Sequence, residues 1–195
     1  MKLTVKKIGN LHKRWLMNIT LIIIAVGLVC VAAVTASYAF YCYQNMNSDL
    51  LNRAKSTTEF FKDYVGQDYD AFYESCMTYA QSFEEGAGTE LELQFIDGNG
   101  KIVASSYGSW AVSSPRTPEI QQALTTRSIQ PFVGRDPDTH ERIMAVSTPL
   151  IYSSGEVIGV LRYVTSTAVM DGEIIGIALV SLGVLLAALL IVLLS

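Results

Sequence analysis

The stretch LELQFIDGNGKIVAS, residues 91–105, decides the fold, because here the hydrophobic period changes from about 3.6 to two. Leu91, Leu93 and Phe95 alternate with polar residues, and the sequence DGNG at 97–100 separates them from a second run rich in Ile and Val. The alternation predicts two strands, and the Asp, Asn and Gly residues between them predict a tight turn. A calcium loop is disfavoured, since the remaining ligands of that pattern are missing.

A long amphipathic stripe precedes this hairpin. Apolar residues recur every three or four positions between residues 46 and 83, mostly with polar residues between them, and this period predicts a helix. Gly66 interrupts the stripe at a cost of about 1 kcal/mol relative to Ala, so we expect two helices that meet near Gly66. The stripe ends at the cluster 84–88, whose glycines suit a left-handed C-terminal cap.

The sequence after the hairpin predicts one short helix and three further strands. Residues 106–117 are rich in Ser, Gly and Pro, as loops are. Thr117 and Pro118 then supply the cap and the first position of a helix at 118–124. The remaining strands are expected at 132–134, 143–152 and 157–165. This order predicts an α+β domain in which a five-stranded antiparallel sheet packs on a long N-terminal helix.

Two apolar runs flank this domain. Residues 19–40 and 174–194 each hold about 21 mostly aliphatic residues, enough at about 1.5 Å per residue to cross a hydrocarbon core of about 30 Å. Cleavage of the first run as a signal peptide is disfavoured, because the run is too long and continues into an aromatic belt. The sequence therefore predicts a tail at 1–15, a transmembrane helix at 16–43, an extracytoplasmic domain at 44–173 and a second transmembrane helix at 174–194.

The distribution of charge predicts how the chain is oriented. Five of the 14 basic residues and none of the 18 acidic residues lie in the first 18 positions. The positive-inside rule therefore places the N-terminus in the cytoplasm and residues 44–173 outside the cell membrane. The overall charge of −4 divides into +5 before residue 19 and −9 after residue 48. An acidic ectodomain without a basic block gives no reason to expect nucleic acid, and it weakly favours cationic or neutral ligands.

Four motifs follow one another in an informative order. They are LQFIDGNGKIVASS at 93–106, TPEIQQAL at 117–124, VSTPL at 146–150 and VIGVLR at 157–162. Together, between two membrane helices, they resemble the extracytoplasmic single-Cache (PDC, PAS-like) sensor domain of bacterial membrane histidine kinases. The resemblance covers most of residues 45–195. It implies the PAS-like α+β fold and the signal-sensing input portion of a two-component sensor histidine kinase, which relays an extracytoplasmic stimulus by movement of its helices.

In that family a HAMP or PAS segment, a dimerisation domain with the phosphorylated His and an ATP-binding domain follow the second membrane helix. Since the sequence ends at Ser195, we expect it to be the N-terminal portion of a longer protein. A cytoplasmic response regulator would then be reached only through that output. Two alternatives stay open: the same sensor fold feeding a chemoreceptor or cyclic-dinucleotide output, and a non-sensory, membrane-anchored interaction module.

Catalytic motifs are missing from these 195 residues. The sequence has no His/Cys cluster, nucleophile elbow or glycine-rich phosphate loop, so we expect no catalysis, cofactor or metal within it. His140-Glu141 is similar to the start of a kinase phosphoacceptor box. However, Thr148-Pro149 follows too late, and the region lies on the outer side, where ATP is absent, so we interpret His140 as a loop residue.

The resemblance also implies where a ligand binds, namely between the sheet and its covering loop and short helix. The candidate binding residues are Tyr107, Trp110, Arg116, Phe132, Arg135 and Arg142. Aromatic rings with a few charged groups suit a small polar organic ligand. Alternatively, the two loop aromatics cap the core and the arginines pair with nearby carboxylates, those of Asp136, Asp138 and Glu141.

The membrane helices suggest a partner. Small residues recur at fourfold spacing, which lets helices approach closely. These are Ala32 and Ala36, Gly172 and Gly176, and Gly183 and Ala187. We therefore expect a parallel homodimer through the membrane helices, with an envelope protein as a further candidate partner outside.

Overall fold

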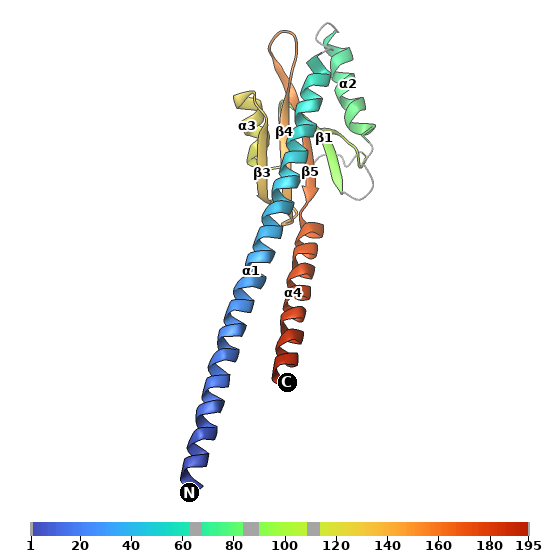
Figure 1. Cartoon of the computed structure of the whole chain (residues 1–195). Helices are drawn as coiled ribbons and strands as arrows, with labels where there is room; N and C mark the ends of the chain where they lie inside the picture. Colours follow the sequence, from blue (N-terminus) through green and yellow to red (C-terminus); the bar gives the residue numbers. More distant parts are fainter. Residues whose placement is uncertain (1, 63–67, 84–89, 109–113, 195) are drawn as a thin grey trace. The chain divides into compact units, whose positions relative to one another are not determined.

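The computed structural model describes residues 2–62, 68–83, 90–108 and 114–194 (Figure 1). Two compact units divide the chain: a helical unit of Met1–Cys42 with Met170–Ser195, and an α/β unit of Tyr43–Val169. Helix α1 (Lys2–Lys62) contributes to both units.

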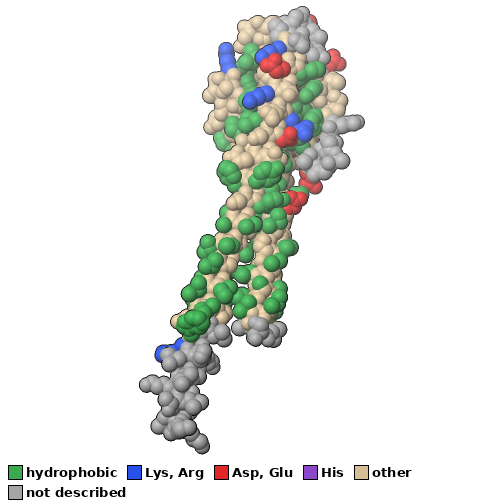
Figure 2. Space-filling model, in the orientation of Figure 1, with side chains coloured by type: hydrophobic (Ala, Val, Ile, Leu, Met, Phe, Trp, Pro, Cys, Tyr) green, Lys and Arg blue, Asp and Glu red, His purple; other side chains and the backbone are tan. Residues whose placement is uncertain are grey.

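The helical unit has the character of a membrane-spanning segment. The stretches Met17–Lys62 of α1 and Ala168–Val192 of α4 (Ala168–Leu194) each contain a segment that is long and apolar enough to cross a membrane, with mean hydropathies over 18 residues of 2.8 and 2.9. Hydrophobic side chains cover the surface of these helices, whereas the visible Asp and Glu side chains lie mainly on the α/β unit (Figure 2). Apolar surface of this extent is stable in lipid and costly in water.

One glycine sets how closely the two helices of this unit pack. A Cβ atom added at Gly27 of α1 would lie 2.3 Å from Leu185 Cδ1 of α4. Real Cβ atoms do not approach that closely, so the missing side chain is what admits Leu185 at this point. Small residues serve the same purpose where helices pack in membranes.

A five-stranded antiparallel sheet forms the centre of the α/β unit, in the order β2-β1-β5-β4-β3. The strands are β1 (Leu91–Asp97), β2 (Ile102–Ser105), β3 (Gln130–Arg135), β4 (Arg142–Ile151) and β5 (Val157–Ser166). The predicted fold class, a five-stranded antiparallel sheet with a long N-terminal helix, is thereby confirmed. Strand β5 lies between β1 and β4, and it ends two residues before α4 begins.

The main hydrophobic core lies between one face of the sheet and two helices, α1 and α2 (Tyr69–Gln81). Leu93 and Phe95 of β1 alternate onto this face, and Leu161 and Tyr163 of β5 join them. The helices contribute Leu50, Ala54, Phe61, Phe72, Cys76 and Ala80. All of these side chains are buried, so this face is the chief source of hydrophobic stabilisation.

The predicted division of the amphipathic stripe into two helices is also confirmed, because α1 ends at Lys62 and α2 begins at Tyr69. Gly66 and the cluster 84–88 lie outside the described residues. Polar contacts fix α1 on the sheet: Thr57 Oγ1 lies 2.6 Å from Tyr163 Oη, and Thr58 Oγ1 lies 2.7 Å from Thr148 Oγ1. Such hydroxyl pairs are directional, so they specify one position of α1 along the sheet.

The opposite face of the sheet carries α3 (Pro118–Thr126) and is apolar only in part. Ile96, Ile120, Ala123 and Val160 form one small cluster beneath α3. Ile143, Ala145 and Val164 form another, against which Phe132 packs. Several of the residues between the two clusters are polar, and the candidate site lies there.

Candidate functional site

A buried arginine lies at the middle of this second face. Arg162 of β5 is 2% exposed, and its cross-strand neighbours are Gln94 of β1 and Ser147 of β4. Glu119, in the first turn of α3, is 0% exposed and accepts a hydrogen bond of 2.9 Å from Arg162 Nε. The Pro118 start of α3 places this carboxylate over the sheet, where it pairs with the guanidinium.

Two more side chains complete the environment of the guanidinium. Arg162 Nη1 donates to Gln94 Oε1 at 2.9 Å, and Nη2 donates to Thr117 Oγ1 at 3.1 Å. Thr117 Oγ1 in turn donates to Glu119 Oε1 at 2.7 Å. Burying an ion pair costs several kcal/mol of desolvation, roughly balanced by attraction and hydrogen bonds only when the geometry is good. The network therefore holds together, but it adds little net stability.

Several buried hydrogen-bonding groups around Arg162 lack a partner among the described residues. Within the described parts of the chain, Glu119 Oε2 and Ser147 Oγ are buried without a hydrogen-bond partner. Arginine has five N–H donors, and Arg162 donates three hydrogen bonds to residues that the structure describes. Buried polar groups are usually satisfied, so unused capacity of this kind is typical of a place where water or a ligand binds.

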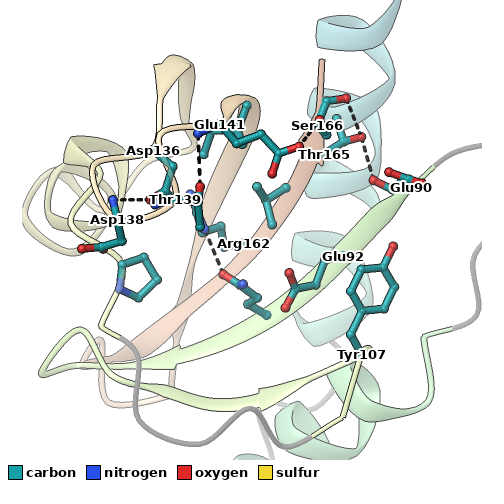
Figure 3. Close-up of a pocket in the computed structure, with 14 residues that line it drawn as sticks. Glu90, Glu92, Tyr107, Asp136, Asp138, Thr139, Glu141, Arg162, Thr165 and Ser166 are labelled. Atoms are coloured by element: carbon teal, nitrogen blue, oxygen red, sulfur yellow. Dashed lines mark hydrogen bonds between the residues drawn. The ribbon is translucent and has the colours of Figure 1, made fainter. Parts of the chain in front are cut away.

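A pocket of about 490 Å³ opens on this same face, with Arg162 among its lining residues (Figure 3). Its walls come from β1, β5, the chain after β2 and the turn between β3 and β4. Five of the lining residues are acidic: Glu90, Glu92, Asp136, Asp138 and Glu141. The volume lies within the range of about 300–1,000 Å³ that is usual for small-molecule sites.

Hydrogen bonds orient the carboxylates of this pocket. Glu92 Oε1 accepts from Ser105 Oγ at 2.6 Å, and Glu141 Oε1 accepts from Ser166 Oγ. Asp136 Oδ1 accepts from the backbone N–H groups of Asp138 and Thr139 and so shapes the β3–β4 turn. Each carboxylate has a second oxygen that can meet a ligand, because a carboxylate accepts several hydrogen bonds.

The residues predicted to bind a ligand occupy different positions. Tyr107 lines the pocket. Arg116 is exposed and pairs with Asp138 of the pocket wall, with Nε 3.0 Å from Oδ1, and this hydrogen bond raises the pKa of the guanidinium. Trp110 lies outside the described residues. Their role in binding stays a prediction, and the alternative that Arg116 pairs with a nearby carboxylate is what the geometry shows.

The other three predicted residues do not line this pocket. Phe132 packs against the Ile143 cluster. Arg135 Nη1 donates to the backbone oxygen of His140 at 3.1 Å, and the guanidinium carbon of Arg142 lies 6.0 Å from the ring centre of Tyr43. His140 itself lies in the β3–β4 turn at φ 60°. Arg135 thus holds the conformation of the turn, whereas Phe132 packs on the sheet and Arg142 contacts α1.

Arg162, Glu119, Gln94 and Glu92 were missing from the sequence-based candidates. One signal was available, since Arg162 is the only charged residue in the apolar run 157–165. A charge in the middle of a buried strand is rare unless it is paired. Its partner could not be read from the sequence, because Glu119 lies 43 positions away.

No protein-family model and no curated protein matches the chain. The structure is similar to the ligand-binding domain of the Pseudomonas aeruginosa PAO1 amino acid chemoreceptor PctC, solved in complex with GABA, at 16% identity and a TM-score of 0.42. That match covers 75% of this chain and 62% of the other. An extracellular ligand-binding receptor from Desulfohalobium retbaense DSM5692 is similar at 16% identity and a TM-score of 0.48, covering 74% of this chain and 26% of that one.

The sensor domain of the V. cholerae histidine kinase DctB is similar at 16% identity and a TM-score of 0.37, covering 66% of this chain and 58% of the other. Thus the chain spans less than two thirds of the length of the structures that it matches. These structural neighbours are extracellular sensory or ligand-binding domains of chemoreceptors and histidine kinases.

Proposed function

We propose that residues 44–173 are the sensory input domain of a membrane receptor and that its ligand binds in the pocket at Arg162. The observation that carries this proposal is that the pocket includes the end of the strand leading into α4. Thr165 and Ser166, the last residues of β5, line it. The next residue, Thr167, donates its backbone N–H to Arg142 O at 2.9 Å, and the N–H of Ala168 donates to Ser166 Oγ at 3.2 Å.

A ligand in this pocket would therefore act on the first residues of α4 through direct hydrogen bonds. Ser166 Oγ donates to Glu141 Oε1, and both residues line the pocket. A ligand that engages Glu141 competes with Ser166 and changes how the start of α4 is held. It shifts the equilibrium between two arrangements only by its difference in affinity for them.

The test uses the whole chain in lipid nanodiscs and a thermal-shift screen of small metabolites. A compound should raise the unfolding temperature of the wild type, and Glu92→Gln should reduce that rise. Glu156→Gln, in the exposed β4–β5 turn, is the matched control and should leave it unchanged. Cysteines placed along α4 should also crosslink at rates that the same compound alters. A screen in which no compound gives a rise sensitive to Glu92→Gln would refute this role for the pocket.

We also propose the orientation with the N-terminus in the cytoplasm and the α/β unit outside, which the charge of the N-terminal tail supports. A Thr125→Cys variant, at an exposed position of α3, should react with a membrane-impermeant maleimide in intact cells. A Lys7→Cys variant should react only after lysis. The reverse pattern would invert the topology.

The finer proposal is that this input belongs to a two-component sensor histidine kinase, which the order of the four motifs supports. A chemoreceptor or cyclic-dinucleotide output is the alternative. The coding sequence downstream of the codon for Ser195 distinguishes them, because a kinase requires a phosphoacceptor His domain and an ATP-binding domain.

A parallel homodimer through α1 and α4 is the proposed assembly. Cβ atoms added at Gly172, Gly176 and Gly183 would meet nothing within 4 Å among the described residues, so these positions are open to a partner helix. Single cysteines along both helices should crosslink with a period of about 3.6 residues. Crosslinking that is absent throughout, or without a period, would contradict the dimer.

A further inference from the structure

The charge balance of the Arg162 pocket indicates the class of its ligand. Among the lining residues, Asp138 is paired with Arg116, and Arg162 is paired with Glu119. Glu90, Glu92 and Glu141 line the pocket and form no salt bridge in the part of the chain that the structure describes, whereas Asp136 is close enough to Arg116 to help raise the pKa of that guanidinium. Three carboxylates without an ion-pair partner and the partly compensated Asp136 surround one cavity, and together they attract a cation and repel an anion.

An independent feature of the pocket calls for a hydrogen-bond acceptor. Arg162 lines the cavity while 2% exposed, and two of its five N–H donors have no protein acceptor within the described residues. A buried donor without an acceptor costs about 1–3 kcal/mol. An oxygen on the ligand would meet these donors, and it would explain why so polar a group is kept under the pocket.

An inorganic cation fits less well than an organic one. The described residues contain no group of three or more His, Cys, Asp or Glu side chains close enough to hold a metal ion. The carboxylates instead surround a cavity of about 490 Å³, which is the size of an organic molecule. A divalent ion needs several oxygens within about 2.6 Å of one point.

We propose that the pocket binds a small organic cation, an amine or guanidine compound that also carries a carbonyl or hydroxyl oxygen. Its cationic group lies among Glu92, Asp136 and Glu141, and its oxygen accepts from Arg162. This assignment rests on the proposed sensory function and adds the chemical class of the ligand. It also gives Glu141 a direct role, because a cation that binds there weakens the hydrogen bond from Ser166.

The test is calorimetric titration of the whole chain in nanodiscs with four probes. Argininamide carries two cationic groups and a carbonyl oxygen, agmatine lacks the oxygen, arginine adds a carboxylate, and succinate is an anion. Argininamide should bind tightest and agmatine about tenfold more weakly, since one charge-assisted hydrogen bond is lost. Succinate should not bind. Affinity for argininamide should also fall as salt rises.

Variants connect binding to the pocket. Glu92→Gln and Glu141→Gln should each weaken argininamide about tenfold, because each removes one charge. Glu156→Gln should leave its affinity unchanged, and thermal unfolding confirms that each variant is folded. If neither Glu92→Gln nor Glu141→Gln changes the affinity for argininamide, the compound binds elsewhere on the chain and the assignment is wrong.

The outcomes separate this assignment from the sensory proposal. If succinate binds and an Arg162 substitution abolishes that binding, the ligand is an anion. The proposed cationic ligand class is then wrong, but the sensory proposal stands. If all four probes fail while the metabolite screen yields a neutral compound sensitive to Glu92→Gln, only the cationic class is wrong. If neither the probes nor the screen finds such a compound, both proposals fail.

Discussion

The two faces of the sheet are built on opposite principles. The face toward α1 and α2 is a continuous apolar core, in which the buried polar contacts are few and mostly between hydroxyl groups. The face toward α3 divides its apolar residues into two small clusters and places a buried Arg162–Glu119 pair near an open pocket. Hydrophobic burial is the dominant favourable term in folding, whereas a buried ion pair contributes little.

This difference separates stability from function. A sheet that is held firmly on one face can carry strained, unsatisfied or polar groups on the other. Such groups tend to be retained where they recognise something. Substitutions on the first face should therefore change the free energy of unfolding, and substitutions of the unpaired carboxylates around the pocket should mainly change binding.

The largest loss of stability is expected for Phe95→Ala. The ring of Phe95 is 0% exposed and lies edge-to-face with Tyr73, with ring centres 5.1 Å apart. Removing it should lower the free energy of unfolding by about 4 kcal/mol, as measured by denaturant titration. Phe60→Ala is the control, because that ring is 43% exposed. Equal losses for the two variants would show that this face is not the chief source of stability.

Arg162→Leu tests the polar face and should cost about 3 kcal/mol. The loss arises because Glu119 would remain buried without its partner. The double variant Arg162→Leu/Glu119→Leu should recover most of this loss, since no charge is then left buried. A double variant as unstable as the single one would show that the pair contributes stability of its own.

Alkaline pH should weaken the apolar face through Cys76. Burial raises the pKa of this thiol from 9.0 to about 12. The folded state therefore favours the neutral thiol, and the associated stability is present below pH 9 and is lost as the pH rises toward about 12. At pH 10, which is one unit above the unfolded pKa, the free energy of unfolding should fall by roughly 1 kcal/mol.

Denaturant titrations at pH 8 and pH 10 measure this loss. Cys76→Ala should be less stable than the wild type at pH 8 because of the cavity, but it should lose less stability on going to pH 10. If the wild type and Cys76→Ala lose the same amount, another group causes the pH dependence. Burial also raises the pKa of Tyr163, so some decline above pH 10 is expected in both.

The apolar face was predictable from the sequence, because its signals are local. The alternation of Leu91, Leu93 and Phe95 and the stripe that α1 and α2 now carry depend only on spacing along the chain. The interruption of the stripe at Gly66 similarly predicted two helices, α1 and α2, in place of one continuous helix. Patterns with periods of 2 and 3.6 residues determine which side chains share a face before any tertiary contact is known.

The pocket was predictable only in outline. The family resemblance implied a ligand site between the sheet, the short helix and the covering loop; Tyr107 lines the pocket, whereas none of its lining residues comes from α3. The pairing of Arg162 with Glu119, and its position between Gln94 and Ser147, depend on strand register over many residues. Arg135 and Arg142 are opposite each other on β3 and β4, but Arg135 contacts the turn and Arg142 lies over Tyr43 of α1. The resemblance suggested binding residues, but long-range register decided which side chains meet.

The smallest expected effect concerns the polar contact that the apolar face does contain. Thr57→Val keeps the shape of the side chain but removes the hydroxyl that lies 2.6 Å from Tyr163 Oη; this hydroxyl also donates to Arg53 O at 2.9 Å and lies 3.3 Å from Tyr79 Oη. The free energy of unfolding should fall by about 1 kcal/mol, the usual net worth of one hydrogen bond. Thr125→Val is the control and should change stability less, because Thr125 is exposed and its hydroxyl donates only to backbone oxygens within α3. Tyr163 lies on β5, the strand that lines the pocket and leads to α4. If Thr57→Val leaves stability unchanged but alters crosslinking along α1, the contact sets the position of α1 on this strand and does not contribute to stability.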